Sequence, residues 1–193
     1  YMQNISKIIK GNPLQHITNS QEFMKMNFFV NNDVLIPRPD TEILVEEVIK
    51  LGKAKSNLTI LDLCTGSGAK NNEVLDRIEF INSNLFEKIE GKFDIIVSNP
   101  PYIKTEVIKT LDNEVQKEPI IALDGGEDGL DFYKKIVEEA YSHLKFNSHL
   151  CFEIGYDQKE AVTEIIKNAN VYSGTYCKKD LYGNDRVIVT SIK

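Results

Sequence analysis

The chain has 193 residues, of which 41% are hydrophobic and 27% are charged, and its formal net charge is −6. This length suits one domain with a sizeable core, and no apolar run approaches the ~20 residues of a membrane-spanning helix. The acidic balance argues against direct binding of duplex DNA, which usually requires a basic face. We therefore expect neither a membrane nor a DNA duplex as a partner.

The cysteines indicate the redox compartment. Cys64, Cys151 and Cys177 are an odd number and have no metal-ligand spacing. Because Cys64 and Cys151 lie in apolar, strand-like stretches, we expect them to be buried free thiols in a reducing cytoplasm. No metal site is expected.

Helix and strand signals alternate along the chain. In its first part they predict the end of a helix and a loop over 1–20, a strand or hairpin arm over 22–30, an extended stretch over 35–40 and a helix over 40–52. Beyond it they predict strands over 58–63, 77–82, 93–98 and 150–154, helices from Asp128 and Gln158, and two last strands over 172–177 and 186–190. This order indicates an α/β fold, a doubly wound sheet with an antiparallel strand at one edge.

One chemical motif, Asn99-Pro100-Pro101-Tyr102, directly follows the strand over 93–98. The Asn99 carboxamide oxygen and the Pro100 carbonyl are two hydrogen-bond acceptors on a stiff backbone. Together they can grip a planar NH2 group, and the Tyr102 ring can cover its face. The same residues are also compatible with a strand that simply ends in a Pro-Pro turn.

A second motif, Asp62-Leu63-Cys64-Thr65-Gly66-Ser67-Gly68, closes the strand over 58–63. Gly66 and Gly68 let the backbone approach a ligand closely, and Asp62 can offset a cationic ligand. The spacing matches neither a dinucleotide fingerprint nor a phosphate loop, so by itself the motif is also compatible with an ordinary strand-to-helix turn.

Together the two motifs resemble class I S-adenosylmethionine-dependent methyltransferases that act on amino groups. Three further stretches, 36–42, 118–130 and 179–186, make the chain similar to the HemK/PrmC family from about Asn12 to its end. Members of that family methylate the glutamine nitrogen in the Gly-Gly-Gln motif of class I peptide chain release factors. The resemblance implies a Rossmann-like methyltransferase fold and a cytoplasmic enzyme of translation termination.

The resemblance also implies roles for individual residues. Asn99 and Pro100 hold the glutamine amide, and Tyr102 walls its side chain beside Pro101. S-adenosyl-L-methionine, and S-adenosyl-L-homocysteine as its product, contact the residues of the following set: Asp62, Cys64, Thr65, Gly66, Ser67, Gly68, Asn84, Leu85 and Asn99.

The chain departs from the family in two places. Residues 1–20 are expected to be the remnant of an N-terminal helical substrate-binding domain and its linker, and residues 21–193 the catalytic domain. Only eight residues separate Gly68 from Arg77, whereas the strand–helix–strand unit of the family requires ~30 or more. We expect a segment that belongs to the protein to be absent from the sequence near 69–71, and with it the acidic residue that binds the cofactor ribose.

Several alternatives stay open at the level of sequence. The chain can be an amino-methyltransferase that acts on adenine in nucleic acid, or a non-catalytic cofactor-binding module. Arg38, Thr41 and Glu42 either brace the pocket wall or form a helix-capping and salt-bridging lead-in. The remaining charged residues of the motifs are expected to fix loops, cap helices or form ion pairs; these are Glu118, Asp124, Asp128 and Arg186.

Overall fold

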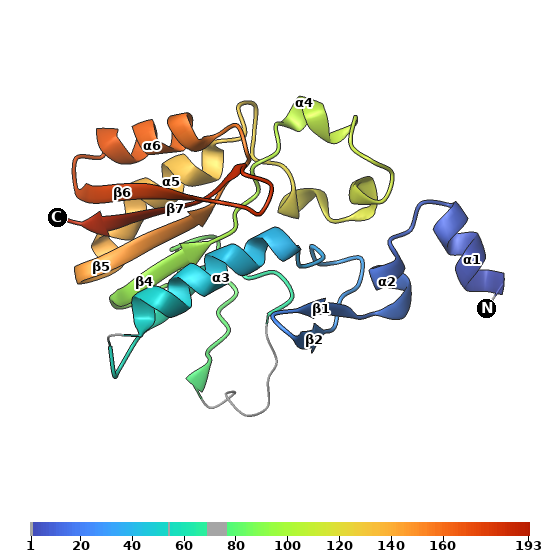
Figure 1. The fold of residues 1–193 in the computed structure, drawn as a ribbon, viewed down its shortest axis with the longest axis horizontal. Helices are drawn as coiled ribbons and strands as arrows, with labels where there is room; N and C mark the ends of the chain where they lie inside the picture. The colour runs from blue at the N-terminus through green and yellow to red at the C-terminus, as the bar shows by residue number, and fades with distance from the viewer. Residues whose placement is uncertain (1, 54, 69–76) are drawn as a thin grey trace.

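A sheet of five strands in the order β3-β4-β5-β7-β6 forms the centre of the molecule (Figure 1). The computed structural model describes residues 2–53, 55–68 and 77–193. Three strands run parallel: β3 (Ile60–Leu63), β4 (Phe93–Ser98) and β5 (Leu144–Glu153). The last strand, β7 (Asp185–Ile192), is antiparallel to both β5 and β6 (Tyr172–Lys179). The predicted α/β class is confirmed.

The antiparallel strand does not lie at the edge of the sheet, contrary to the sequence prediction. It is β7, one position inside the edge strand β6. Residues 187–190 of β7 are all buried, whereas most of β6 is exposed or half-buried. The more apolar arm of the hairpin therefore takes the inner position, where both of its faces are covered.

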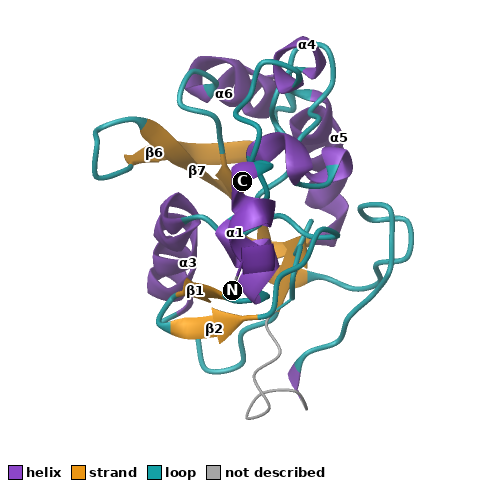
Figure 2. Cartoon of the chain, turned by 90° about the vertical axis from the view of Figure 1, so that its right-hand side faces the viewer, coloured by secondary structure: helices purple, strands orange, loops and turns teal. Residues whose placement is uncertain are grey.

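Helices cover both faces of the sheet (Figure 2). On one face, α3 (Pro39–Gly52) packs Leu44 and Val48 against Ile95 of β4 and neighbouring residues of β5 and β7. On the other face, α5 (Asp131–Ala140) and α6 (Lys159–Asn168) cover Ile96 and the alternate residues of the same strands. Successive strand side chains point to opposite faces, so these central strands must be apolar in consecutive positions.

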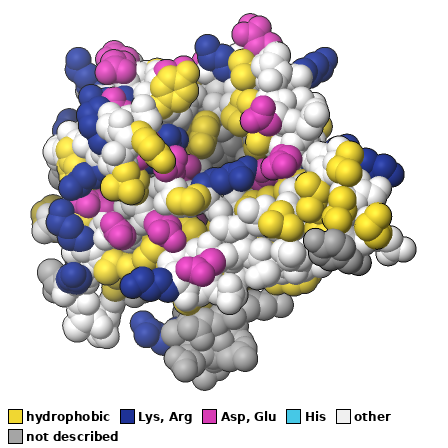
Figure 3. All heavy atoms as spheres, turned by 45° about the vertical axis from the view of Figure 1, so that its right-hand side comes forward, with side chains coloured by type: hydrophobic (Ala, Val, Ile, Leu, Met, Phe, Trp, Pro, Cys, Tyr) yellow, Lys and Arg dark blue, Asp and Glu magenta, His cyan; other side chains and the backbone are white. Residues whose placement is uncertain are grey.

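The N-terminal elements lie at the end of the molecule opposite the C-terminus (Figure 1). They are α1 (Met2–Ile9), α2 (Leu14–Thr18) and a hairpin of β1 (Gln21–Phe23) and β2 (Met26–Phe28). Helix α1 buries none of its residues, and hydrophobic side chains gather on this side of the surface (Figure 3). The predicted helix end is confirmed. The single strand or hairpin arm predicted over 22–30 is wrong, because the chain turns at Met24-Lys25 and forms both arms of a short hairpin over 21–28. The division into a remnant domain and a catalytic domain stays a prediction.

Short elements join the core strands. The segment after β4 contains α4 (Thr105–Ile108), η2 (Val115–Lys117) and η3 (Ile120–Ala122), and η4 (Tyr141–His143) links α5 to β5. Among the described residues, no helix is long and apolar enough to cross a membrane.

The strand predicted over 77–82 is absent, and these residues form irregular chain apart from a single 3-10 position at Arg77. A parallel neighbour of β3 requires a crossover of a dozen or more residues. The eight residues between Gly68 and Arg77 are too few. The stretch therefore has strand-like composition but cannot reach a parallel position beside the edge strand β3, and Phe80 and Ile81 are exposed.

Candidate functional site

The two motifs lie side by side because their strands are hydrogen-bonded neighbours. Leu63, the last residue of β3, is in register with Ser98, the last residue of β4. The Ser98 hydroxyl also donates to the Leu63 carbonyl at 2.9 Å. The loops that follow both strands therefore leave the same edge of the sheet, which is where open α/β sheets bind ligands.

The glycine loop presents open backbone at this edge. Cys64, Gly66 and Gly68 all have positive φ, at 63°, 61° and 56°. A Cβ added to Gly66 would meet no atom of the described residues within 4 Å, whereas one added to Gly68 would lie 2.8 Å from the Phe80 ring. The space in front of Gly66 is thus available to a ligand, while Gly68 is required by packing.

Asp62 lies at the entry to this loop. The Thr65 hydroxyl donates to its carboxylate at 2.6 Å. The side chain is accessible to solvent, yet the surrounding protein displaces enough water to raise the Asp62 pKa to about 6, and the Thr65 hydrogen bond opposes this rise. Asp62 is therefore a carboxylate that titrates just below neutral pH.

Cys64 corrects a sequence prediction, because its side chain is exposed and not buried. The left-handed backbone at this position turns the chain out of β3 before the side chain can enter the core. Cys151, in the middle of β5, is buried as predicted.

Asn84 and Leu85 lie in a turn after the irregular stretch. Asn84 is exposed, and its side-chain amide donates to Glu87 at 2.6 Å. Leu85 has φ of 47° and packs partly against the core. Their contact with a ligand stays a prediction.

The Asn99–Tyr102 segment is held from several sides. Pro100 and Pro101 are buried, and the Gln158 side chain donates to the Tyr102 carbonyl at 3.0 Å. A Cβ on Gly125 would lie 2.7 Å from the Tyr102 Cα, so only glycine permits this crossing of two chain segments. The acceptors of the motif therefore stand on rigid backbone.

Two acceptors of this segment remain open. The side-chain amide nitrogen of Asn99 donates to the Thr41 hydroxyl at 3.2 Å, so the carboxamide oxygen Oδ1 is the end that does not contact Thr41. Within the described part of the chain, no hydrogen bond ends on Asn99 Oδ1 or on the Pro100 carbonyl.

Asn99, Pro100 and Tyr102 line a narrow cavity of about 80 Å³. Burial raises the pKa of Tyr102 to about 12, so its hydroxyl stays neutral at physiological pH. Seven further residues line the cavity: Leu35, Arg38, Ile103, Val115, Ala122, Leu123 and Glu153.

Glu153 is a site residue that sequence reasoning missed. It is the last residue of β5 and is 1% exposed, and one carboxylate oxygen has no hydrogen-bond partner among the described residues. An acidic residue at the carboxyl end of an apolar strand was the signal that could have identified it.

The structure resolves the open roles in the lead-in to α3. Arg38 forms an ion pair with buried Glu118, which also accepts from the Ile36 amide at 2.8 Å. Glu42 accepts from the Met24 amide at 2.6 Å. Thr41 alone of the three contacts the motif, through Asn99. Arg38 and Thr41 therefore brace the wall of the site, while Glu42 fixes the β1–β2 turn.

The other charged residues have the loop-fixing and ion-pairing roles expected of them. Asp124 accepts from the Thr105 hydroxyl at 2.7 Å and from the Gly126 amide. Asp128 accepts from the Leu130 amide at 3.0 Å and from the Lys134 ammonium at 2.6 Å, so it fixes the loop before α5 but does not cap the helix, whose N-cap is Leu130. Arg186 pairs with Asp180 at 3.1 Å and with Asp40 at 3.3 Å.

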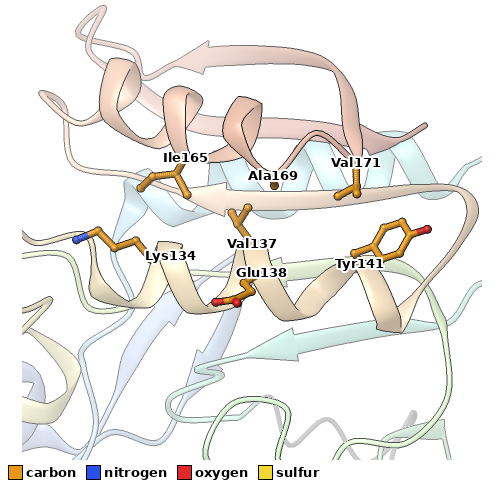
Figure 4. Close-up of a pocket in the computed structure, with 7 residues that line it drawn as sticks. All are labelled: Lys134, Val137, Glu138, Tyr141, Ile165, Ala169 and Val171. Atoms are coloured by element: carbon orange, nitrogen blue, oxygen red, sulfur yellow. The ribbon is translucent and has the colours of Figure 1, made fainter.

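A larger cavity of about 300 Å³ lies elsewhere, between α5 and α6 (Figure 4). Its walls are mainly apolar, from Val137 and Tyr141 on one side and Ile165 and Val171 on the other. No residue of either motif lines it, so we do not assign it the chemistry of the site.

Comparisons with known proteins agree with this geometry. The Eco57I restriction-modification methylase family matches residues 7–155. A release factor glutamine methyltransferase of Clostridium botulinum is 40% identical over 223 residues, covering 97% of this chain and 78% of the relative. One from Clostridium acetobutylicum is 40% identical over 224 residues, covering 98% of this chain and 78% of the relative.

A solved structure is also similar. It is the release factor-specific protein-(glutamine-N5) methyltransferase of Alicyclobacillus acidocaldarius, which is 25% identical. The match covers 86% of this chain and 99% of that chain, with a TM-score of 0.52.

The two clostridial alignments exceed the 193 residues of this chain by about 30 positions. The relatives therefore carry residues that have no counterpart here, as a missing strand–helix–strand unit requires. The predicted break near 69–71 lies outside the described residues, and its position stays a prediction.

Proposed function

We propose that this chain, which belongs to the release factor glutamine methyltransferase family, transfers a methyl group from S-adenosylmethionine to a glutamine of class I peptide chain release factors. The acceptor is the side-chain nitrogen of the glutamine in the Gly-Gly-Gln motif. The observation that carries the proposal is the pair of open acceptors, Asn99 Oδ1 and the Pro100 carbonyl, next to the glycine loop. A substrate of this kind places the reaction in the cytoplasm.

The acceptors address the central difficulty of the reaction. An amide nitrogen is a poor nucleophile because its lone pair is delocalised into the carbonyl. Asn99 Oδ1 and the Pro100 carbonyl each accept a hydrogen bond from one of its two N–H groups. These hydrogen bonds hold the nitrogen in place and stabilise the positive charge that develops on it. The neutral Tyr102 ring walls the side chain. Positioning and electrostatics do this work without a covalent intermediate on the protein.

The glycine loop fits the methyl donor. The open space at Gly66 admits a ligand against the backbone, and the Asp62 carboxylate can offset its positive charge. When bound, S-adenosylmethionine would supply an electrophilic methyl group: its sulfur–methyl bond would break as the nitrogen–methyl bond forms, S-adenosylhomocysteine would leave, and the amide nitrogen would release one proton to solvent. Residues 62 and 64–68 would hold its methionine end, and Asn84 and Leu85 would lie near the adenine.

A methyl-transfer assay tests the proposal. The protein is incubated with S-adenosylmethionine labelled in its methyl group and with a release factor that carries Gly-Gly-Gln. Label is expected on that glutamine, and replacing the glutamine by alanine in the release factor should eliminate it. Label that persists on the altered factor would overturn the assignment.

A second candidate function is adenine methylation in nucleic acid, which the match to the Eco57I restriction-modification methylase family favours. The two open acceptors suit any NH2 group, so they do not discriminate. The net charge of −6 disfavours contact with phosphates. Oligonucleotides in the same assay decide the matter, because efficient labelling of adenine would support this candidate.

A third candidate is a non-catalytic cofactor-binding module. The reason to consider it is that the relatives carry residues that have no counterpart in this chain. Calorimetry with S-adenosylmethionine separates the readings. Binding together with label transfer identifies an enzyme, whereas binding without transfer to any acceptor identifies a module.

The affinity for S-adenosylmethionine should depend on Asp62 ionisation. Because the pKa of Asp62 is raised to about 6, the carboxylate loses its charge as pH falls below 6. Affinity is then expected to fall by up to about tenfold per pH unit between pH 6 and 4. Calorimetry across this range measures the effect, and Asp62→Asn should bind weakly with a flat profile. A pH-dependent profile that survives in Asp62→Asn would assign the titration to another group.

A further inference from the structure

The Glu153 carboxyl group has no role in the proposed chemistry, yet it lines the cavity beside Asn99. It lies at the end of β5, is 1% exposed and leaves one oxygen without a hydrogen-bond partner among the described residues. A buried carboxyl group is costly to retain, so its position calls for a function.

The neighbours of Glu153 form a short chain of polar groups. Burial raises the pKa of Glu153, and the negative charge of Asp40 adds to the rise. Hydrogen bonding by Thr41 and Asn99 and the positive charge of Arg186 oppose it. Thr41 and Asn99 are themselves joined, since the Asn99 amide donates to the Thr41 hydroxyl at 3.2 Å. The carboxyl group therefore borders both partners of that hydrogen bond.

The direction of these hydrogen bonds determines how the Asn99 carboxamide is turned. A hydroxyl that accepts from Asn99 still has its own proton to donate, and the buried Glu153 oxygen without a partner among the described residues is an acceptor for it. Glu153 therefore favours Thr41 as its donor and leaves the Thr41 lone pair for the Asn99 NH2 group. A carboxamide turned by 180° would place its oxygen against Thr41 and Glu153, and its NH2 group in the cavity.

We propose that Glu153, acting together with Thr41, is a positioning residue that locks the Asn99 carboxamide with its oxygen toward the methyl-accepting nitrogen. The proposal rests on the proposed function for the identity of the acceptor. A turned carboxamide would confront the substrate NH2 group with another donor and would lose the interaction. The lock thus keeps the acceptor available before the substrate arrives.

Kinetics of paired variants test whether Thr41 and Glu153 fix the orientation of the Asn99 carboxamide. Thr41→Val removes the hydroxyl at constant shape, and Glu153→Leu removes the acceptor at similar volume. Each is expected to lower kcat about tenfold, the scale of one orienting hydrogen bond, with the affinity for S-adenosylmethionine unchanged. Thr41→Ser keeps the hydroxyl in place and should stay within about threefold of the parent.

Two controls separate positioning from general damage. Glu47→Leu removes another buried carboxyl group, which accepts from the Tyr176 hydroxyl and does not line the cavity, and should leave kcat unchanged. In an Asn99→Ala background, Thr41→Val should cause no further loss, because the group that it positions is gone. A further tenfold loss in that background would overturn the proposal.

A readout without turnover keeps this inference distinct from the proposed function. The side-chain NH2 resonances of Asn99, identified by their disappearance in Asn99→Ala, should show slow hydrogen exchange in the parent protein. They should exchange rapidly in Thr41→Val and in Glu153→Leu. Unchanged exchange in both variants would refute the lock, whichever substrate the enzyme methylates.

Discussion

Asn99→Ala is expected to lower the rate of methyl transfer to the release factor by about 10²–10³-fold, the usual consequence of removing one preorganised group at a developing charge. The substitution removes one of the two open acceptors and leaves the Pro100 carbonyl. The glutamine nitrogen then keeps one hydrogen bond where it had two, and its orientation is no longer fixed. Single-turnover transfer of labelled methyl measures the effect.

The fold should survive this substitution. Asn99 is half-buried, and the loss of its side-chain hydrogen bond to Thr41 costs about 1 kcal/mol. Thermal unfolding should therefore shift by only a few degrees. Asn168→Ala, an exposed position on α6, serves as the matched control and should leave both quantities unchanged. Turnover of Asn99→Ala within a few-fold of the parent would remove Asn99 from the mechanism.

The motifs could be predicted from sequence because their signals are local. The apolar run of β4 ends at Ser98, and Asn99 and two prolines follow, so the bounds of the strand and the position of Asn99 at its carboxyl end both follow from neighbouring residues. The glycine loop is read in the same way from Asp62 to Gly68.

Features that depend on a distant partner could not be predicted in this way. The stretch 77–82 has the composition of a strand, but pairing requires a neighbour that the short connection from Gly68 cannot reach. The inner position of β7 depends on how deeply each arm of the hairpin is buried. Thr41 and Glu153 meet Asn99 from α3 and β5, and no local pattern joins residues so far apart in the chain.

Gly66→Val is expected to weaken the binding of S-adenosylmethionine by more than about 100-fold. The reason is steric, because the side chain would fill the open space in front of the loop where the ligand is placed. The valine also adds backbone strain, since the φ of 61° at this position costs an L-residue roughly 1–2 kcal/mol. Calorimetry with the purified variant gives the affinity directly.

Gly174→Val separates the two causes. Gly174 has φ of 64° and likewise no atom within 4 Å of an added Cβ, but it lies on the edge strand β6. The backbone strain is therefore matched, while the glycine loop is untouched, and we expect this variant to bind S-adenosylmethionine like the parent. If Gly174→Val also loses binding, the loss reflects a damaged fold. If Gly66→Val retains full affinity, the ligand does not lie against the glycine loop, and Asp62 loses its proposed role as well.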